Sequence, residues 1–149
     1  MSLEGNLADT IRAAMNSARK AQDKGRTLVL GTILANLKNR EIELGRAPAD
    51  DEVVDVVRKG IKLRREAAEQ YAKASRPALA AVEEAQIRVL EEFLPPAVDP
   101  AEVRAAVREV IASGTRELGK VMGQVLPRFK GRVEGKLVNQ IVREELQAG

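Results

Sequence analysis

The sequence contains no histidine and no cysteine among its 149 residues. These absences exclude zinc sites of the Cys/His type, thiol nucleophiles, Ser-His triads and acid–base chemistry by histidine. No disulfide can form, so nothing in the composition indicates an oxidising compartment. We therefore expect no catalytic residues, no metal site and no cofactor in this chain.

Aromatic residues are nearly absent, because the chain has one tyrosine, two phenylalanines and no tryptophan. The core must therefore be aliphatic. No apolar run approaches the length of a membrane span, and the N-terminus lacks the basic-then-apolar order of a signal peptide. From these absences we expect a cytoplasmic protein without membrane association.

The residues that are abundant favour helices. Alanine, leucine, glutamate, arginine and lysine dominate the sequence, and no alternating pattern predicts a strand. Apolar residues at spacings of three and four predict four helices in the first part of the chain, with Asp50 capping the third and with Leu79 and Val82 in the buried stripe of the fourth. The helices are expected at about residues 3–21, 26–44, 50–74 and 77–94, packed as a bundle or as a pair of hairpins.

A proline pair, Pro95-Pro96, interrupts the helical pattern, because proline lacks an amide donor and restricts the residue before it. We predict an N-terminal domain at 1–94, a linker at 95–98 and a C-terminal domain at 99–149. The C-terminal domain is expected to hold three short helices. Pro100 opens the first, Thr115 caps the second, and Pro127 ends or kinks the second. The predicted fold class is all-α, with a four-helix region followed by a three-helix tail domain.

The most informative stretch is 118–142, which holds four of the chain's eleven glycines among basic and aliphatic residues. Between Arg116 and Lys136 there are six Lys/Arg and two acids, an excess of +4, whereas the whole chain has a net charge of +3. Clusters of this kind, together with helix N-termini, recognise phosphate backbones. A solvated charged surface, with glycines that ease helix packing, explains the same pattern about equally well.

Other candidate sites receive a plainer interpretation. The paired acids Glu83-Glu84, Glu91-Glu92 and Glu144-Glu145 are expected on solvated faces, balanced by nearby arginines. The basic run from Arg58 to Arg65 is also interpreted as a solvated face, with an auxiliary contact surface as the lesser alternative. No phosphate-loop spacing occurs. Because aromatic stacking platforms are missing, contact with nucleic acid would involve its backbone and shape.

Several segments, taken in order and at matching spacing, resemble the GatB/YqeY family over the whole chain. The matching segments are 38–43, 90–95, Gly119-Lys120-Val121-Met122-Gly123, Pro127, 130–132 and Gly135-Lys136. The resemblance is to the free-standing YqeY-like proteins, whose C-terminal half is similar to the tail domain of the B subunit of the glutamine-dependent tRNA amidotransferase. Val133 and Glu134 depart from the Ala-Asp of this motif, and Glu134 is the poorer helix cap.

The resemblance implies an all-helical, two-domain protein. In the amidotransferase the tail domain helps to hold tRNA by its elbow. By similarity, the residues predicted to bind RNA are Lys120, Arg128, Lys130, Gly131, Arg132, Gly135 and Lys136. Gly131 and Gly135 are interpreted as the turn that presents the basic residues, and Gly119 and Gly123 as helix-packing positions.

The leading hypothesis is a non-catalytic protein that binds tRNA or another structured RNA, with a protein partner docked on the N-terminal helices. One alternative is a helical adaptor that uses Gly119 and Gly123 as a packing face. A further alternative is an accessory factor of a glutamine-dependent tRNA amidotransferase, a carbon–nitrogen ligase with glutamine as amide donor. The catalytic cradle of that enzyme is absent from this sequence.

Overall fold

The computed structural model describes residues 6–129 and 132–149. Every regular element in this part of the chain is helical, so the all-α prediction is confirmed. Contacts divide the chain into two compact units, Met1–Leu94 and Pro95–Gly149, here called the N-terminal and C-terminal units. That the two units are separate domains joined by a 95–98 linker stays a prediction.

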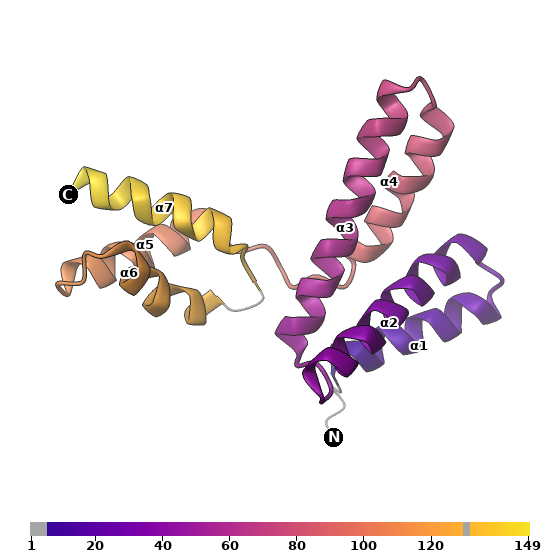
Figure 1. Cartoon of the computed structure of the whole chain (residues 1–149), viewed down its shortest axis with the longest axis horizontal. Helices are drawn as coiled ribbons and strands as arrows, with labels where there is room; N and C mark the ends of the chain where they lie inside the picture. Colours follow the sequence, from indigo (N-terminus) through magenta and orange to yellow (C-terminus); the bar gives the residue numbers. More distant parts are fainter. Residues whose placement is uncertain (1–5, 130–131) are drawn as a thin grey trace. The chain divides into compact units, whose positions relative to one another are not determined.

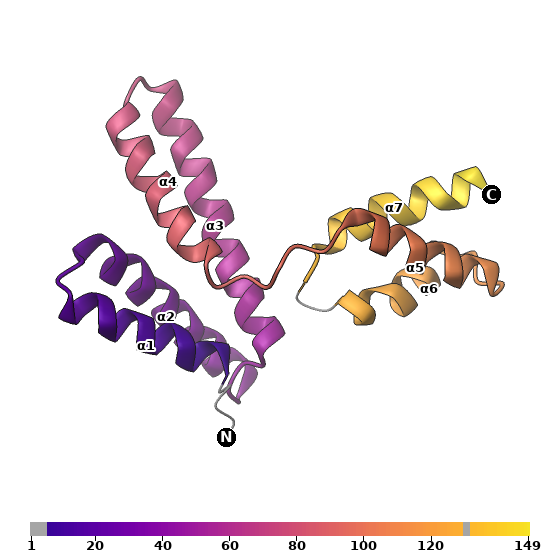
Figure 2. The ribbon, with the colours of Figure 1, turned by 180° about the vertical axis from the view of Figure 1, so that it is seen from behind.

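The N-terminal unit is a pair of antiparallel helical hairpins (Figures 1 and 2). Its helices are α1 (Leu7–Lys20), α2 (Lys24–Leu44), α3 (Asp50–Lys73) and α4 (Pro77–Glu91). Helices α1 and α2 form the first hairpin, α3 and α4 form the second, and α2 contacts both helices of the second. Their shared core is aliphatic: Ile11, Val29, Leu30, Ile33, Leu37, Val53, Val57, Ile61, Ile87 and Leu90.

Local sequence signals determine most of the helix ends. Asp23 caps α2 by accepting a hydrogen bond from the Arg26 amide at 3.1 Å, and Gly45 ends α2 with a φ of 73°, which favours glycine. Pro77 opens α4 at its first turn. The start of α1 at Leu7, capped by Asn6, is later than predicted, and residues 1–5 lie outside the described part.

The prediction that Asp50 caps its own helix is wrong. The N-cap of α3 is Ala49, and Asp50 is the first residue of the helix. The Asp50 carboxylate instead accepts a hydrogen bond from the backbone amide of Leu7 at 2.8 Å. It therefore satisfies an otherwise unpaired donor at the start of α1 and joins the two hairpins.

Leu79 and Val82 are also not core residues, since they are 43% and 52% exposed. They lie in the half of α4 next to the turn that connects it to α3. The shared core draws its α4 residues from the other half, at Ile87 and Leu90, where α2 packs against the hairpin. Near the turn only the facing helix is present to cover α4, and Ala80 fills that narrower contact.

A charged side chain, Glu52, caps the start of α3 together with Arg46. Arg46 donates to both carboxylate oxygens of Glu52, at 2.7 and 3.1 Å, and the Ala49 amide donates to the same side chain at 2.9 Å. The Arg46 guanidinium first, and the Ala49 amide second, lower the pKa of Glu52 from 4.5 to about 2. Folding therefore favours the ionised form of this carboxyl group.

Glu52→Gln is expected to lower the urea midpoint of the N-terminal unit at pH 7, with the difference from the unaltered protein closing between pH 4.5 and about pH 2. The folded pKa is the depressed one, so the contribution is fully present above the unfolded value and is lost as pH falls. Urea unfolding followed by circular dichroism across this window measures the difference. Glu43→Gln is the control, because it removes a carboxylate that has no partner among the described residues. If the difference in urea midpoint also closed between pH 4.5 and about pH 2 for Glu43→Gln, the effect could not be assigned to Glu52.

The C-terminal unit packs three helices and a 3₁₀ turn around a mostly valine core. Its elements are α5 (Pro100–Ala112), α6 (Leu118–Val125), the 3₁₀ helix η1 (Leu126–Phe129) and α7 (Gly135–Ala148). Asp99 caps α5 by accepting from the Ala101 amide at 2.9 Å, and Pro100 occupies the first turn as expected. Val98 is buried in this core, so ordered packing begins before the cap.

Pro127 changes the helix type, as its missing amide predicts. The α-helical hydrogen bonding of α6 ends at Val125, and the tighter turn η1 carries the chain through Pro127 to the buried Phe129. The prediction that Thr115 caps α6 is wrong, because the N-cap is Glu117. The Thr115 hydroxyl instead accepts a hydrogen bond from Gln124 at 3.3 Å.

Candidate nucleic-acid interface

The start of α7 carries two of the predicted RNA-binding cations. Lys136 is the second residue of the helix, and Arg132 lies just before it; both side chains are exposed. The Arg132 amide donates to the Phe129 carbonyl at 2.8 Å, and its guanidinium carbon lies 6.0 Å from the centre of the Phe129 ring. Phe129 is itself buried in the core, so it ties the position of Arg132 to the rigid part of the unit.

The first turn of α7 leaves two backbone amides without an acceptor among the described residues, those of Gly135 and Lys136, whereas the Leu137 amide donates to the Glu134 carbonyl at 3.1 Å. Glu134 is the N-cap, but its side chain makes no capping hydrogen bond. Gly135 is exposed, and a Cβ added there would have no described atom within 4 Å. A helix N-terminus has a partial positive charge, so open amides beside two cations suit an anionic group. We call Arg132, Lys136 and the backbone amides of Gly135 and Lys136 the α7 N-terminal surface.

Two other predicted cations are partly neutralised within the unit. Lys120, on α6, lies 3.3 Å from Glu117, and both side chains are 72% exposed. Arg128, in η1, lies 3.3 Å from Glu109 of α5. Surface pairs of this length are weak, so each cation stays available to a stronger anion at little cost. The acid that faces Arg128 is 19 positions away in the sequence, and no local signal pointed to it.

Lys130 and Gly131 lie outside the described residues, so their predicted role in RNA binding stays a prediction. Among the described residues, only Arg132 and Lys136 of the predicted cations have no carboxylate partner. The turn that the sequence assigned to Gly131 and Gly135 is described only at its second glycine, where α7 begins.

The interpretation of Gly119 and Gly123 as packing positions within the chain is wrong. Both are exposed on α6, and a Cβ at either position would meet no described atom within 4 Å. Glycine at these two positions lowers the stability of α6, and no close contact with the described residues of the C-terminal unit requires it.

The excess of positive charge counted along the sequence does not form one patch. Arg116 donates to the Leu146 carbonyl at 3.4 Å, near the C-terminal end of α7. Lys136 is ten residues earlier on the same helix, roughly 15 Å away at 1.5 Å per residue. Arg116 therefore contacts the opposite end of α7 and does not belong to the α7 N-terminal surface.

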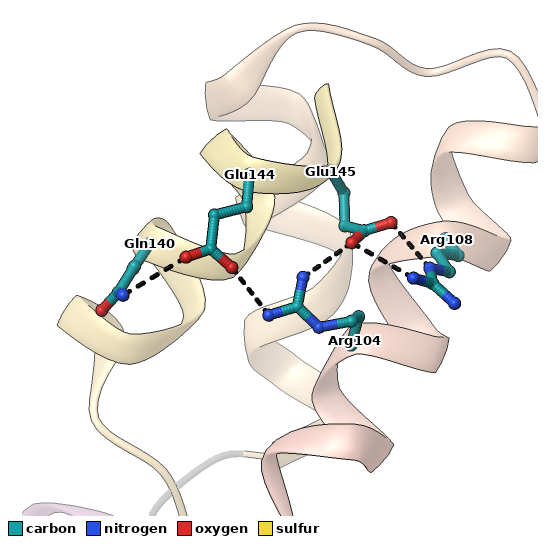
Figure 3. A network of polar contacts seen from close by, with 5 residues as sticks. All are labelled: Arg104, Arg108, Gln140, Glu144 and Glu145. Atoms are coloured by element: carbon teal, nitrogen blue, oxygen red, sulfur yellow. Dashed lines mark hydrogen bonds and ion pairs between the residues drawn. The ribbon is translucent and has the colours of Figure 1, made fainter. Parts of the chain in front are cut away.

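An ion-pair network clamps α7 to α5 and so orients the candidate surface (Figure 3). Arg104 donates to Glu144 at 2.7 Å and to Glu145 at 2.6 Å, and Arg108 donates to Glu145 at 2.7 Å. The arginines lower the pKa of both glutamates: Arg104 acts most on Glu144, and Arg108, then Arg104, on Glu145. The expectation of a solvated Glu144-Glu145 pair is wrong for Glu145, whose side chain is only 10% exposed.

The described residues hold no group of three or more Asp, Glu, His or Cys side chains that could bind a metal ion. Within the same ranges, none of the helices is both long enough and apolar enough to cross a membrane. The expected absence of catalytic, metal and cofactor sites stays a prediction.

The geometry defines a class of protein: an all-helical chain whose C-terminal unit exposes cations and open amides at the start of its last helix. Comparison with known families identifies the chain's family. A family model described as Yqey-like protein matches residues 8–146, and the chain belongs to this family.

Two relatives show how far the similarity extends. An uncharacterised protein of Schizosaccharomyces pombe is 34% identical over 90 residues, which cover 60% of this chain and 73% of the relative. A protein of Pyrenophora tritici-repentis, named altered inheritance of mitochondria protein 41, mitochondrial, is 26% identical over 151 residues and covers 97% of this chain and 83% of the relative. The cytoplasmic location expected for this chain stays a prediction.

Proposed function

We propose that this protein binds tRNA or another structured RNA without catalysing a reaction, and that the α7 N-terminal surface is its principal contact. The observation that carries the proposal is that two cations without a carboxylate partner among the described residues, Arg132 and Lys136, lie beside the open Gly135 and Lys136 amides at the start of α7. The resemblance to an amidotransferase tail domain that holds tRNA supports the same assignment. Lys130, between the two described segments, belongs to the proposed contact by its sequence position.

Backbone recognition gives the proposal a quantitative test. Arg132→Gln with Lys136→Gln should lower the dependence of log K on log salt by about 1.4–1.8, since each lost phosphate contact removes about 0.7–0.9. The same loss corresponds to roughly 25- to 60-fold weaker binding at 0.1 M salt. Fluorescence anisotropy with labelled total tRNA at several salt concentrations measures both quantities.

The matched control is Lys20→Gln with Lys73→Gln, which removes the same charge from two exposed helix ends of the N-terminal unit. Its salt slope should equal that of the unaltered protein. The proposal would be contradicted if tRNA binding did not depend on salt, or if the control pair lost as much affinity for tRNA as the Arg132 and Lys136 pair.

The adaptor hypothesis keeps one supporting observation. Gly119 and Gly123 are four residues apart and exposed, with open space above them, so a helix from another protein could approach α6 closely. Affinity capture with and without nuclease separates the two functions, because loss of all partners after nuclease treatment counts against the adaptor. The accessory role with a tRNA amidotransferase would be dropped if added protein left amidation of misacylated tRNA unchanged.

A further inference from the structure

A groove between α2 and α3 gathers polar side chains that the proposed RNA contact does not use. It has a volume of about 560 Å³, and Figure 1 shows the two helices meeting at the connection between them. Its charged residues are Arg40 and Glu43 of α2 and Asp55 and Lys59 of α3. The rest of the lining is Asn36, Asn39, Val56, Gly60 and Leu63. We call this site the α2–α3 groove.

The lining residues form one stripe on each helix. On α2 they recur at positions 36, 39, 40 and 43, and on α3 at positions 55, 59 and 63, which is the spacing of a single helix face. Glu43 and Asp55 are nearest the connection between the helices, and Asn36 and Leu63 are farthest from it. The groove therefore has an acidic end, a basic middle at Arg40 and Lys59, and an end with an amide and an apolar side chain.

These polar groups have no partner within the described part of the chain. Arg40 and Glu43, at i and i+3, and Asp55 and Lys59, at i and i+4, have spacings that allow ion pairs. Neither pair forms a hydrogen bond or an ion pair among the described residues. The side chains of Asn36 and Asn39 also make no hydrogen bond within this part of the chain. Arg40 lowers the pKa of Glu52 through its charge alone, without contacting it. All six groups are thus available to an external molecule.

The charges and hydrogen-bonding groups of the α2–α3 groove indicate what kind of molecule it can bind. Two cations and two anions cancel, so a phosphate backbone would meet repulsion from Glu43 and Asp55 as well as attraction. Each asparagine offers both a donor and an acceptor, which matches a peptide group. Leu63, at 54% exposed, offers apolar surface at the far end. Only Gly60 of the lining is buried, so a small ligand would stay hydrated, whereas an extended chain could make all these contacts at once.

We propose that the α2–α3 groove binds an extended peptide segment of a partner protein that presents an apolar, an acidic and a basic residue in that order or its reverse. The apolar residue lies on Leu63, the acidic residue faces Arg40 and Lys59, and the basic residue faces Glu43 and Asp55. Residues 55–63 of α3 span roughly 12 Å, and alternate side chains of an extended chain share one face, so three side chains that face the groove need about five residues. This inference does not rest on RNA binding.

The test is selection from a displayed library of random nine-residue peptides on the full-length protein. The expected consensus has the apolar, acidic and basic residues at alternate positions, within about five residues. With Arg40→Glu and Lys59→Glu, the consensus should replace its acidic residue with a basic one, and the original consensus peptide should bind about tenfold or more weakly by fluorescence anisotropy.

A second charge reversal keeps the test decisive if the first variant unfolds. Glu43→Lys with Asp55→Lys should exchange the basic residue of the consensus for an acidic one and leave the rest unchanged. Lys20→Glu with Lys73→Glu is the matched control for total charge, and it should select the original consensus. Circular dichroism establishes that each variant is folded before selection.

The proposal is overturned if the unaltered protein selects no consensus, or if both charge reversals select the original one. A loss of tRNA binding in the Arg40→Glu and Lys59→Glu variant, with no peptide consensus, would assign the groove to RNA instead. Unchanged tRNA binding together with an altered peptide consensus supports the peptide site and separates it from the α7 N-terminal surface.

Discussion

Phe129→Ala is expected to lower the free energy of unfolding of the C-terminal unit by about 3–5 kcal/mol, which is the usual cost of removing a buried aromatic ring. Phe129 is 7% exposed and is the one aromatic residue in a core otherwise made of valine, alanine and isoleucine. These short buried side chains can fill little of the cavity left by the ring, and the longer side chains packed against this core, such as Met122 and Leu126, are only partly buried. A unit this small has little stability in reserve, so the loss should leave much of it unfolded.

Amide hydrogen exchange on the full-length protein measures this effect separately in each unit. Protection should fall for the amides of α5, α6 and α7, while the amides of the N-terminal unit serve as an internal control. Phe129→Leu retains most of the apolar volume and should cost much less. Equal loss of protection in both units, or no loss in the C-terminal unit, would show that Phe129 is not the centre of this core.

Gly60→Val is expected to destabilise the N-terminal unit by about 1–3 kcal/mol, because the core around Gly60 has no room for a side chain. A Cβ at this position would lie 2.8 Å from Cδ1 of Ile33 and 3.5 Å from Cδ1 of Leu90. A side chain at position 60 would therefore press against core side chains of both α2 and α4. Gly25→Val is the control, because a Cβ there would meet no described atom within 4 Å.

A double-mutant cycle can identify the clash itself. Ile33→Val removes the Cδ1 atom nearest to position 60 and should cost about 0.5–1.5 kcal/mol alone. In that background Gly60→Ala should stabilise the unit by up to about 1 kcal/mol, since alanine is the better helix former. In the unaltered background the close contact should offset this gain. Urea unfolding of the four proteins gives the coupling, and additive effects would disprove the proposed contact.

The candidate site could be predicted only in part from the sequence. Arg132 and Lys136 are exposed, as predicted, and Pro127 ends the helix that precedes them, as its missing amide predicts. Arg116 was counted with them because it is close in sequence, yet it contacts Leu146 at the other end of α7. The α2–α3 groove was not predicted, because its two stripes belong to different helices.

The sequence by itself determined that this protein is helical, where most helices begin and end, and which family it belongs to. These features depend on interactions between residues at most about four apart: periodic apolar side chains, caps such as Asp23 and Asp99, and proline's missing amide. Only the tertiary structure decided that Asp50 caps a helix 43 positions away and that Glu145 binds an arginine 41 positions away. Such partners are brought together by how the helices pack, and no local pattern encodes the distance between them.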